Sequence, residues 1–305
     1  MADTPENKAA PAEIYFDQPL IFTLPENHAR GRFVRLGPVL DLILSAHGYP
    51  PAIERVLADA LTLTALLGST LKQADGQLTL QAQTENGLIE LLVCDYKAGE
   101  LRGYLKFDAE RAAEMPDDPS LFALFGKGYL AITFDQASSD ERYQGIVPLD
   151  GENLAEAAQN YFVQSDQLPT LVQLATRRDP VAGCVAGGLF LQYLPDGEEG
   201  RERLHVRDDN PEWDHVSALA ATMGAEELTN PELSLETLTW RLFHEEEIRV
   251  TPGLKLSRGC RCDADYLKSV LARFPESERA AMADENGNIV IDCAFCSRLF
   301  PVAVD

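Results

Sequence analysis

The feature that most constrains this chain is a set of four cysteines near its C-terminal end. Cys260 and Cys262 form one close pair in GCRCD, and Cys293 and Cys296 form a second in DCAFCS. Two close pairs can each hold one edge of a tetrahedral zinc ion, for which thiolates are favoured ligands. The same four thiols are the most readily oxidised groups in the sequence. The pattern therefore predicts a zinc site with oxidisable ligands.

The alternative is that these thiols are structural groups without a metal. Buried thiols seldom occur as two close pairs in an acidic segment with few large apolar residues, which favours the metal. Cys94 and Cys184 lie alone in apolar stretches, and we expect both to be small core residues. The N-terminal stretch MADTPENKAAPAE has no apolar region typical of a signal peptide. We therefore expect a cytoplasmic protein, in which thiols stay reduced.

The spacing within the pairs matters for their oxidation. C-x-C holds its two sulfurs on a shorter tether than the C-x-x-C that is usual in zinc ribbons. If the metal left, Cys260 could close on Cys262 and Cys293 on Cys296, because each partner is already local. Disulfides in such small rings tend to be strained and reducible, which suits a reversible switch.

Cations flank the cysteine pairs: Lys255, Arg258 and Arg261 lie near the first pair, and Arg298 follows the second. They would stabilise the negative charge of zinc bound by four thiolates. Ordinary solvated surface charges explain them equally well. The chain as a whole has a net charge of −23, which repels phosphate backbones and anionic lipid. We therefore expect neither nucleic acid nor a membrane as a partner.

The order of the predicted elements indicates an α+β fold. Strands are expected at 77–83, 88–96 and 101–107, the first two joined by a turn at Asn86-Gly87. A helix is expected from Pro51 to about Leu71, and it is predicted to be buried because its part ALTLTALLGSTLK is apolar nearly all round. A further helix is expected at 152–164, and the strands and helices do not alternate as in a βαβ protein.

The composition divides the chain into four predicted parts. They are a disordered tail at 1–12, a mixed α/β core domain at 13–206, a metastable linker at 207–252 and a small zinc-binding redox domain at 253–305. The last part has too few large apolar residues to build a sufficient core unaided. Structural zinc can contribute on the order of 10 kcal/mol to such a unit, so we expect metal binding and folding to be one event.

The linker is predicted to be mostly helical and to fold only against a neighbour. From Arg207 to Val250 it holds eleven acidic and three basic residues, and eleven minus three gives a net charge of −8. An acidic segment of this kind is not expected to fold alone. Its large apolar side chains are the expected contacts with the core: Trp213, Leu235, Leu238, Trp240, Leu242 and Phe243.

Together these segments resemble the redox-regulated 33-kilodalton heat-shock chaperones, or 33 kDa chaperonins. The resemblance rests on CRC at 260–262, CAFC at 293–296, FHEE at 243–246 and YFVQSDQLPT at 161–170. It covers nearly the full length, and all four cysteines of the specific C-x-C…C-x-x-C motif are kept.

The resemblance implies that the reduced protein holds one Zn²⁺ per chain on Cys260, Cys262, Cys293 and Cys296 and is a poor chaperone. Peroxide or hypochlorous acid, together with mild unfolding, would release zinc and form the disulfides Cys260–Cys262 and Cys293–Cys296. The linker and the C-terminal part would then lose structure and uncover apolar surface. The protein would form a homodimer and hold unfolding client proteins without ATP.

Two other functional classes compete with this interpretation. One is an adaptor in which zinc only stabilises a protein-interaction surface, so that peroxide damages the protein without creating activity. The other is a zinc enzyme, which is disfavoured because four cysteines close the coordination shell and leave no open site. The sequence also lacks H-E-x-x-H, G-x-S-x-G and P-loop motifs. We therefore expect a chaperone and no enzymatic activity.

Overall fold

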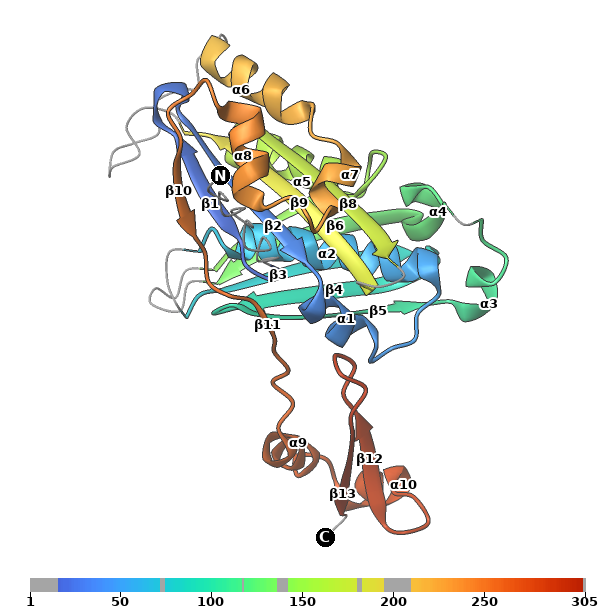
Figure 1. Cartoon of the computed structure of the whole chain (residues 1–305). Helices are drawn as coiled ribbons and strands as arrows, with labels where there is room; N and C mark the ends of the chain where they lie inside the picture. Colours follow the sequence, from blue (N-terminus) through green and yellow to red (C-terminus); the bar gives the residue numbers. More distant parts are fainter. Residues whose placement is uncertain are drawn as a thin grey trace, which may run out of the picture.

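The computed structural model describes residues 16–71, 75–116, 118–135, 142–179, 183–194 and 210–303. The tail predicted at 1–12 lies outside these residues. Two large sheets enclose a long helix, three shorter helices cover one sheet, and a small C-terminal unit ends the chain (Figure 1). The strands and helices follow no βαβ order, and the predicted α+β fold class is confirmed.

The first sheet has five strands in the order β10-β1-β2-β9-β8. All neighbouring pairs are antiparallel. Its strands are β1 Leu20–Leu24, β2 Ala29–Leu36, β8 Thr170–Asp179, β9 Gly183–Tyr193 and β10 Arg249–Pro252. The last of these belongs to the segment predicted as a mostly helical linker. The exposed RVTP stretch becomes a strand because it pairs with the edge of β1.

The second sheet has six strands in the order β11-β5-β4-β3-β6-β7. Its strands are β3 Gln77–Glu85, β4 Ile89–Lys97, β5 Glu100–Phe107, β6 Lys127–Asp135, β7 Arg142–Pro148 and β11 Ser257–Arg258. The predicted hairpin between the first two is confirmed, with Asn86 at φ 60°. Only β11 pairs in parallel, and it covers the outer edge of β5.

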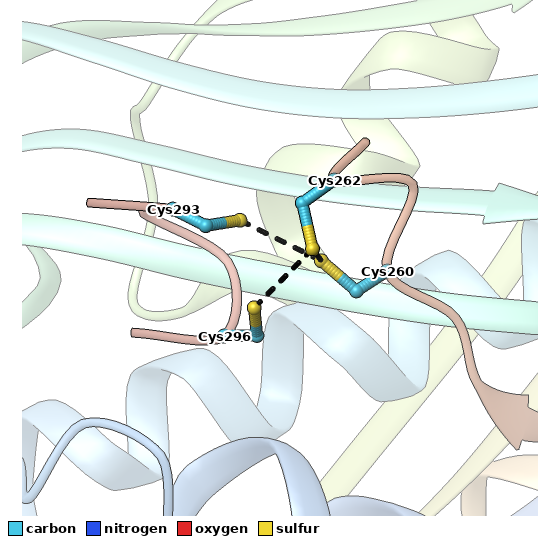
Figure 2. Close-up of side chains that lie close together, drawn as sticks. All are labelled: Cys260, Cys262, Cys293 and Cys296. Carbon is cyan, nitrogen blue, oxygen red and sulfur yellow. Dashed lines mark hydrogen bonds between the residues drawn. The ribbon is translucent and has the colours of Figure 1, made fainter. Parts of the chain in front are cut away.

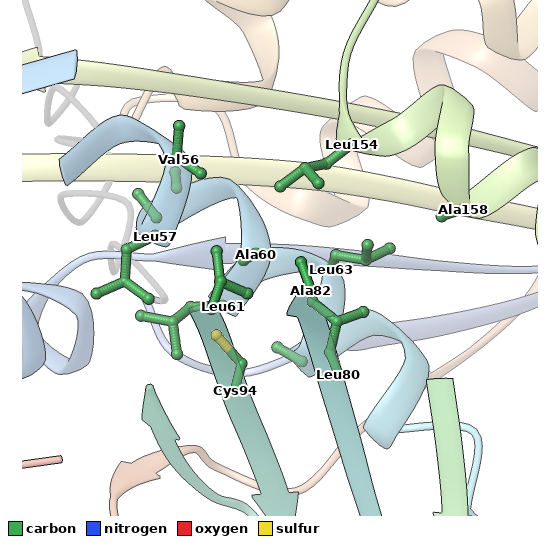
Figure 3. Packing of buried hydrophobic residues seen from close by; sticks show 14 of the residues in the cluster. Val56, Leu57, Ala60, Leu61, Leu63, Leu80, Ala82, Cys94, Leu154 and Ala158 are labelled. Atoms are coloured by element: carbon green, nitrogen blue, oxygen red, sulfur yellow. The ribbon is translucent and has the colours of Figure 1, made fainter. Parts of the chain in front are cut away.

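Helix α2, Pro51–Gly68, lies between the two sheets and is buried on nearly every side. Its leucines contact inward side chains of β3 and β4 on one side and those of helix α5, Leu154–Tyr161, on another (Figure 3). The buried hydroxyls of Thr62 and Thr64 donate to the carbonyls of Ala58 and Ala60 at 2.8 and 2.7 Å. Hence no polar group of these threonines is left without a partner inside the core.

The remaining short elements of the core differ in detail from the prediction. Helix α1 is Pro38–Leu44, and the expected helix 152–164 changes at its end into a π-helical turn, Phe162–Asp166. Two one-turn helices were not expected, α3 Ala109–Ala112 and α4 Leu121–Phe125. Each is set by a local cap, from the side chains of Asp108 and Ser120.

Three helices of the predicted linker pack on the open face of the first sheet (Figure 1). They are α6 Pro211–Ala221, α7 Ala225–Thr229 and α8 Leu235–Phe243. The segment 210–243 is called the linker helices below. Their apolar side chains join those of β1, β2 and β9 in a second cluster, separate from the core around α2. The proposed domain boundaries stay a prediction.

The C-terminal unit is small. It contains α9 Ala264–Leu271, α10 Glu276–Met282 and the hairpin of β12 Asn288–Asp292 with β13 Leu299–Ala303. The sequence did not predict strand β13, because its five residues include a proline. The apolar cluster of this unit is formed by Leu271, Ile289 and Val302, none of which is fully shielded from solvent.

Candidate metal centre

The first cysteine pair follows directly from the edge of the second sheet. The backbone N–H of Gly259 donates to the carbonyl of Leu101 on β5 at 2.8 Å, which continues the pairing of β11. A Cβ atom at position 259 would lie 2.4 Å from the Cβ of Glu100, so only glycine lets the chain approach this closely. Cys260 and Cys262 are thereby fixed just beyond the sheet.

The second pair lies in the loop that closes the β12–β13 hairpin. The N–H of Cys293 donates to the carbonyl of Arg298 at 3.0 Å, and the Cys293 carbonyl accepts from Cys296 at 3.1 Å and from Ser297 at 2.8 Å. Ser297 has a φ of 52°, in the left-handed region. This tight turn brings the sulfurs of Cys293 and Cys296 to the same side of the loop.

The four predicted cysteines meet at one point, with the two pairs facing each other from separate segments (Figure 2). The Sγ atom of Cys260 lies 3.3 Å from that of Cys262 and 3.6 Å from that of Cys293, and the Sγ atoms of Cys262 and Cys296 are 3.7 Å apart. All four Sγ atoms lie within 4.8 Å of one another. A tetrahedral ion with bonds of about 2.3 Å to sulfur requires sulfurs roughly 3.8 Å apart. The arrangement therefore fits a single metal ion.

Three of the four thiols ionise less easily than a free cysteine, and the fourth ionises more easily. Burial raises the pKa of the Cys260, Cys262 and Cys293 thiols above its ordinary value. Burial acts in the same direction on Cys296, but the backbone N–H of Arg298 and the neighbouring thiols outweigh it and lower the pKa to about 7. A bound dication would offset the unfavourable effect of burial on thiolate charge. Metal-bound thiols are deprotonated, and the metal neutralises their charges together.

A single aromatic side chain connects the centre to the core. Phe295, between the two cysteines of the second pair, packs edge-on against Tyr104 of β5 with ring centroids 4.8 Å apart. The guanidinium carbon of Arg102 lies 4.0 Å from the centroid of the same ring. Arg102 is itself held by Asp95, whose Oδ2 accepts its Nε–H at 2.7 Å. The sequence prediction missed this contact, although a phenylalanine inside a polar metal loop was a possible signal.

Two polar contacts accompany Phe295. Arg261, which lies between Cys260 and Cys262, donates from Nη1 to the Oε1 of Gln77 at 2.8 Å. The Ser297 hydroxyl lies 3.3 Å from the Nδ1 of His47, beyond the end of α1. The metal loops thus contact the core from both pairs. The stabilising role predicted for the flanking cations stays a prediction, since Arg261 is directed to a core amide.

Comparison with known proteins agrees with this geometry. The family model described as Hsp33 protein matches residues 17–302. The chain belongs to the Hsp33 family. Its relatives include the 33 kDa chaperonin of Caulobacter vibrioides, 38% identical over 286 residues that cover 92% of both chains. The 33 kDa chaperonin of Yersinia pestis is 36% identical over 272 residues, which cover 88% of this chain and 87% of the relative.

The fold is also that of a solved Hsp33 homologue. The crystal structure of the 33 kDa chaperonin from Thermotoga maritima superposes with a TM-score of 0.79 and covers 94% of this chain and 95% of its own, at 19% identity. Among the described residues, no helix combines the length and the apolar character required to cross a membrane.

The linker side chains of this Hsp33-family chain are placed as follows. Leu235, Leu238 and Phe243 are buried in the cluster under the linker helices, and Trp213 and Leu242 are partly buried against it. Trp240 differs from the expectation, because 62% of its side chain is exposed. It lies on the solvent side of α8, where its ring contacts His244 one turn later, with centroids 5.2 Å apart. Helical periodicity explains this, since Trp240 is not on the face shared by Leu235, Leu238 and Leu242.

The two remaining cysteines are core residues, as predicted. Cys94 is fully buried on β4 and Cys184 is 2% exposed on β9. Burial raises the pKa of both thiols, that of Cys184 to about 12. Neither is a ready nucleophile or metal ligand.

Proposed function

We propose that this Hsp33-family protein is a redox-regulated holdase that binds unfolding proteins without ATP. The observation that carries the proposal is the position of its most oxidisable groups. The four clustered thiols are also the groups that hold the C-terminal unit together and set its contact with the core. A chemical change at sulfur therefore changes tertiary structure.

In the reduced state, we propose that Cys260, Cys262, Cys293 and Cys296 hold one Zn²⁺. The thiolate-only donor set is typical of structural zinc, and the sulfur spacing fits it. Bound zinc supplies folding free energy to a unit whose apolar cluster contains only three buried side chains among the described residues. This reduced state keeps the linker helices on the first sheet and is inactive.

Oxidation removes the ligand set. Within each pair, two thiolates give up two electrons and form one disulfide, and one hydrogen peroxide takes up these electrons together with two protons from water and becomes two waters. We assign the bonds as Cys260–Cys262 and Cys293–Cys296, because each pair is local in the sequence and the Sγ atoms of the first pair are already 3.3 Å apart. Disulfide sulfurs are poor ligands, so zinc is released.

Loss of the ligand set disconnects the C-terminal unit from the core. The turn that presents Phe295 depends on the metal loop, and the pairing of β11 with β5 continues directly into the first cysteine pair. The linker helices then detach, and Leu238 and Phe243 leave the cluster that also contains Phe22 and Phe33 of the first sheet. The uncovered apolar surface binds unfolding clients and a second copy of the chain.

The test compares reduced and oxidised protein. Zinc and free thiols are counted in the reduced protein, which is then treated with peroxide at elevated temperature, and the aggregation of an unfolding client is followed by light scattering without ATP. We expect zinc release, loss of four thiols and suppression of aggregation. If zinc leaves and disulfides form but client aggregation is not suppressed, the holdase proposal fails, and the interpretation as an adaptor protein remains. A Cys184→Ala variant, altered at a buried thiol outside the centre, should behave like the wild type.

A further inference from the structure

Arg35 of β2 is a fully buried arginine that has no carboxylate partner among the residues that the structure describes. Only 2% of its surface is exposed, and it is the largest of the fully buried side chains in the described part of the chain. Across the same residues, no carboxylate lies within ion-pair distance of its guanidinium. A buried charge of this kind is costly unless polar groups surround it.

The linker helices supply those groups. The Nε–H of Arg35 donates to the carbonyl of Leu228 at 2.8 Å, and its two terminal nitrogens donate to the carbonyls of Leu233 at 2.6 Å and Glu227 at 3.1 Å. Glu227 and Leu228 lie in the last turn of α7, where helical carbonyls lack intrahelical donors, and Leu233 lies in the connection to α8. One guanidinium thus binds the backbone on both sides of the α7–α8 connection.

A glycine beside Arg35 permits this approach. Gly187 of β9 is the register partner of Arg35. A Cβ atom at position 187 would lie 2.3 Å from the carbonyl oxygen of Leu228, which is shorter than any tolerable contact. The linker backbone therefore lies directly on the sheet at a place where a glycine and a buried arginine are neighbours.

We propose that Arg35 and Gly187 form a seat for the linker backbone and are the positioning residues that hold the linker helices in the docked state. The seat binds main-chain carbonyls, so it fixes the position of α7 and α8 independently of their side chains. The regulatory consequence, that the seat opposes activation of the reduced protein, rests on the proposed function. The docking of the linker on Arg35 and Gly187 is independent of the proposed function.

The seat is on the face of the first sheet that carries the linker, whereas Phe295 contacts the second sheet. Burial lowers the pKa of Arg35 to about 10, so the group remains charged near neutral pH. Without the guanidinium, the carbonyls of Leu228 and Leu233 lose the donors described above, and that of Glu227 keeps only the N–H of Asn230, the residue after α7, at 3.3 Å. They regain hydrogen bonds only if water enters, which requires the linker to lift from the sheet.

The test uses the full-length reduced, zinc-loaded protein and an Arg35→Met variant, which keeps an unbranched apolar stem. Hydrogen–deuterium exchange is measured by mass spectrometry on peptides covering 225–243. We expect at least tenfold faster exchange there, with unchanged zinc content and unchanged exchange in α2. The matched control is Arg241→Met, which removes the exposed contact of another arginine with the Glu227 side chain at 3.3 Å. The control should exchange like the wild type.

Two further variants keep the inference testable if Arg35→Met does not fold. Arg35→Lys keeps the charge but has no planar fork to reach three carbonyls, so an intermediate increase is expected. Gly187→Ala should accelerate exchange of the same peptides, although alanine is otherwise the better strand residue. Wild-type linker exchange in the folded variants overturns the inference.

A client-aggregation assay on the same reduced samples separates the two proposals. If linker exchange increases and aggregation is suppressed without oxidant, both proposals are supported. If linker exchange increases and aggregation is not suppressed, the seat is supported and the holdase proposal fails.

Discussion

The core and the C-terminal unit of this chain are stabilised in different ways. In the core, two sheets enclose α2 and bury one continuous cluster of leucine, isoleucine, valine, alanine and aromatic side chains. In the C-terminal unit, the apolar cluster is reduced to Leu271, Ile289 and Val302, beside four sulfurs that converge on one point. The first region is stabilised by burial of apolar surface, and we propose that the second is stabilised by bonds to a metal ion.

This difference decides where a chemical signal can act. Oxidation has little access to the apolar core, whose thiols are buried and have raised pKa values. In the C-terminal unit the same thiols are the proposed metal ligands, so we expect their oxidation to remove the main source of its stability. The linker helices lie between the two cases, because they are docked on the core by apolar contacts and by Arg35.

The largest expected effect is that of metal removal. A zinc chelator, or the variant Cys293→Ser, should unfold the C-terminal unit, a loss on the order of 10 kcal/mol of metal-linked folding free energy. Amide exchange should become fast in 264–303 and stay slow in α2. The measurement is peptide-resolved hydrogen exchange with a parallel metal assay, and Cys184→Ala is the control. Slow amide exchange in β12 and β13 without metal would contradict the proposal that ligand bonds stabilise the C-terminal unit.

The next prediction concerns a substitution that should destabilise the core and leave the metal centre unchanged. Leu61 on α2 is fully buried between the sheets, so Leu61→Ala leaves a cavity and should cost about 2–5 kcal/mol in the free energy of unfolding. Thermal unfolding of the core should shift downward while zinc content is unchanged. The control is Leu42→Ala on α1, where 53% of the side chain is exposed and a change within about 0.5 kcal/mol is expected. Equal shifts for both variants would exclude the assigned packing.

A smaller effect is expected from a carboxyl group on the central helix. Burial raises the pKa of Asp59 to about 6, against the opposing effect of the hydrogen bond that it accepts from Thr176 at 2.6 Å. Its pKa is higher in the folded than in the unfolded state, so its favourable contribution is complete below about pH 4 and is lost as the pH rises through 6. Asp59→Asn should therefore be more stabilising at pH 7 than at pH 4, by about 2 kcal/mol.

Denaturant titrations of the wild type and Asp59→Asn at the two pH values measure this difference. Glu110→Gln on the exposed helix α3 is the control for removal of a carboxylate in general. A stability difference between wild type and Asp59→Asn that does not change with pH would disprove the assigned burial of Asp59.

The smallest effect concerns the contact between the two regions. Phe295→Ala removes the ring that packs on Tyr104 and under Arg102, a contribution of about 1 kcal/mol, and should leave the four sulfurs and the bound zinc in place. The amides of Ser257 and Gly259, which donate to the carbonyls of Gly99 and Leu101, should then exchange about fivefold faster. Phe274→Ala, a ring of the same unit that is 39% exposed, is the control. No acceleration would mean that β11 and the polar contacts of Arg261 and Ser297 fix the metal loops without the ring.

Most of the local structure could be predicted from the sequence, because it depends on local patterns. The Asn86-Gly87 turn, the alternating strands β3 and β4 and the apolar helix α2 each have a period or a turn residue that indicates their structure. The short elements β10, β11 and β13 could not be predicted in this way. They are strands because of the strand beside them, and pairing partners are not encoded in the segment itself.

In the candidate site, too, some features could be predicted from the sequence and others could not. The spacing of Cys260, Cys262, Cys293 and Cys296 was sufficient to predict that the four thiols lie together, because a metal ion accepts only a few arrangements of ligands. The sequence also indicated that the C-terminal part lacks a core of its own. The predicted contact of Trp240 with the core is wrong, because the residue type alone does not show which face of a helix a side chain occupies.

Only the tertiary structure decided how the metal loops and the linker are held on the core. Phe295 meets Tyr104, and Arg35 meets the carbonyl of Leu228, across more than 190 positions of the chain. No periodicity or motif relates such residues, and a buried arginine in a strand looks like any exposed one until the backbone that covers it is known. The cysteine spacing therefore indicates the metal centre from the sequence alone, whereas the contacts that connect this centre to the rest of the molecule required the fold.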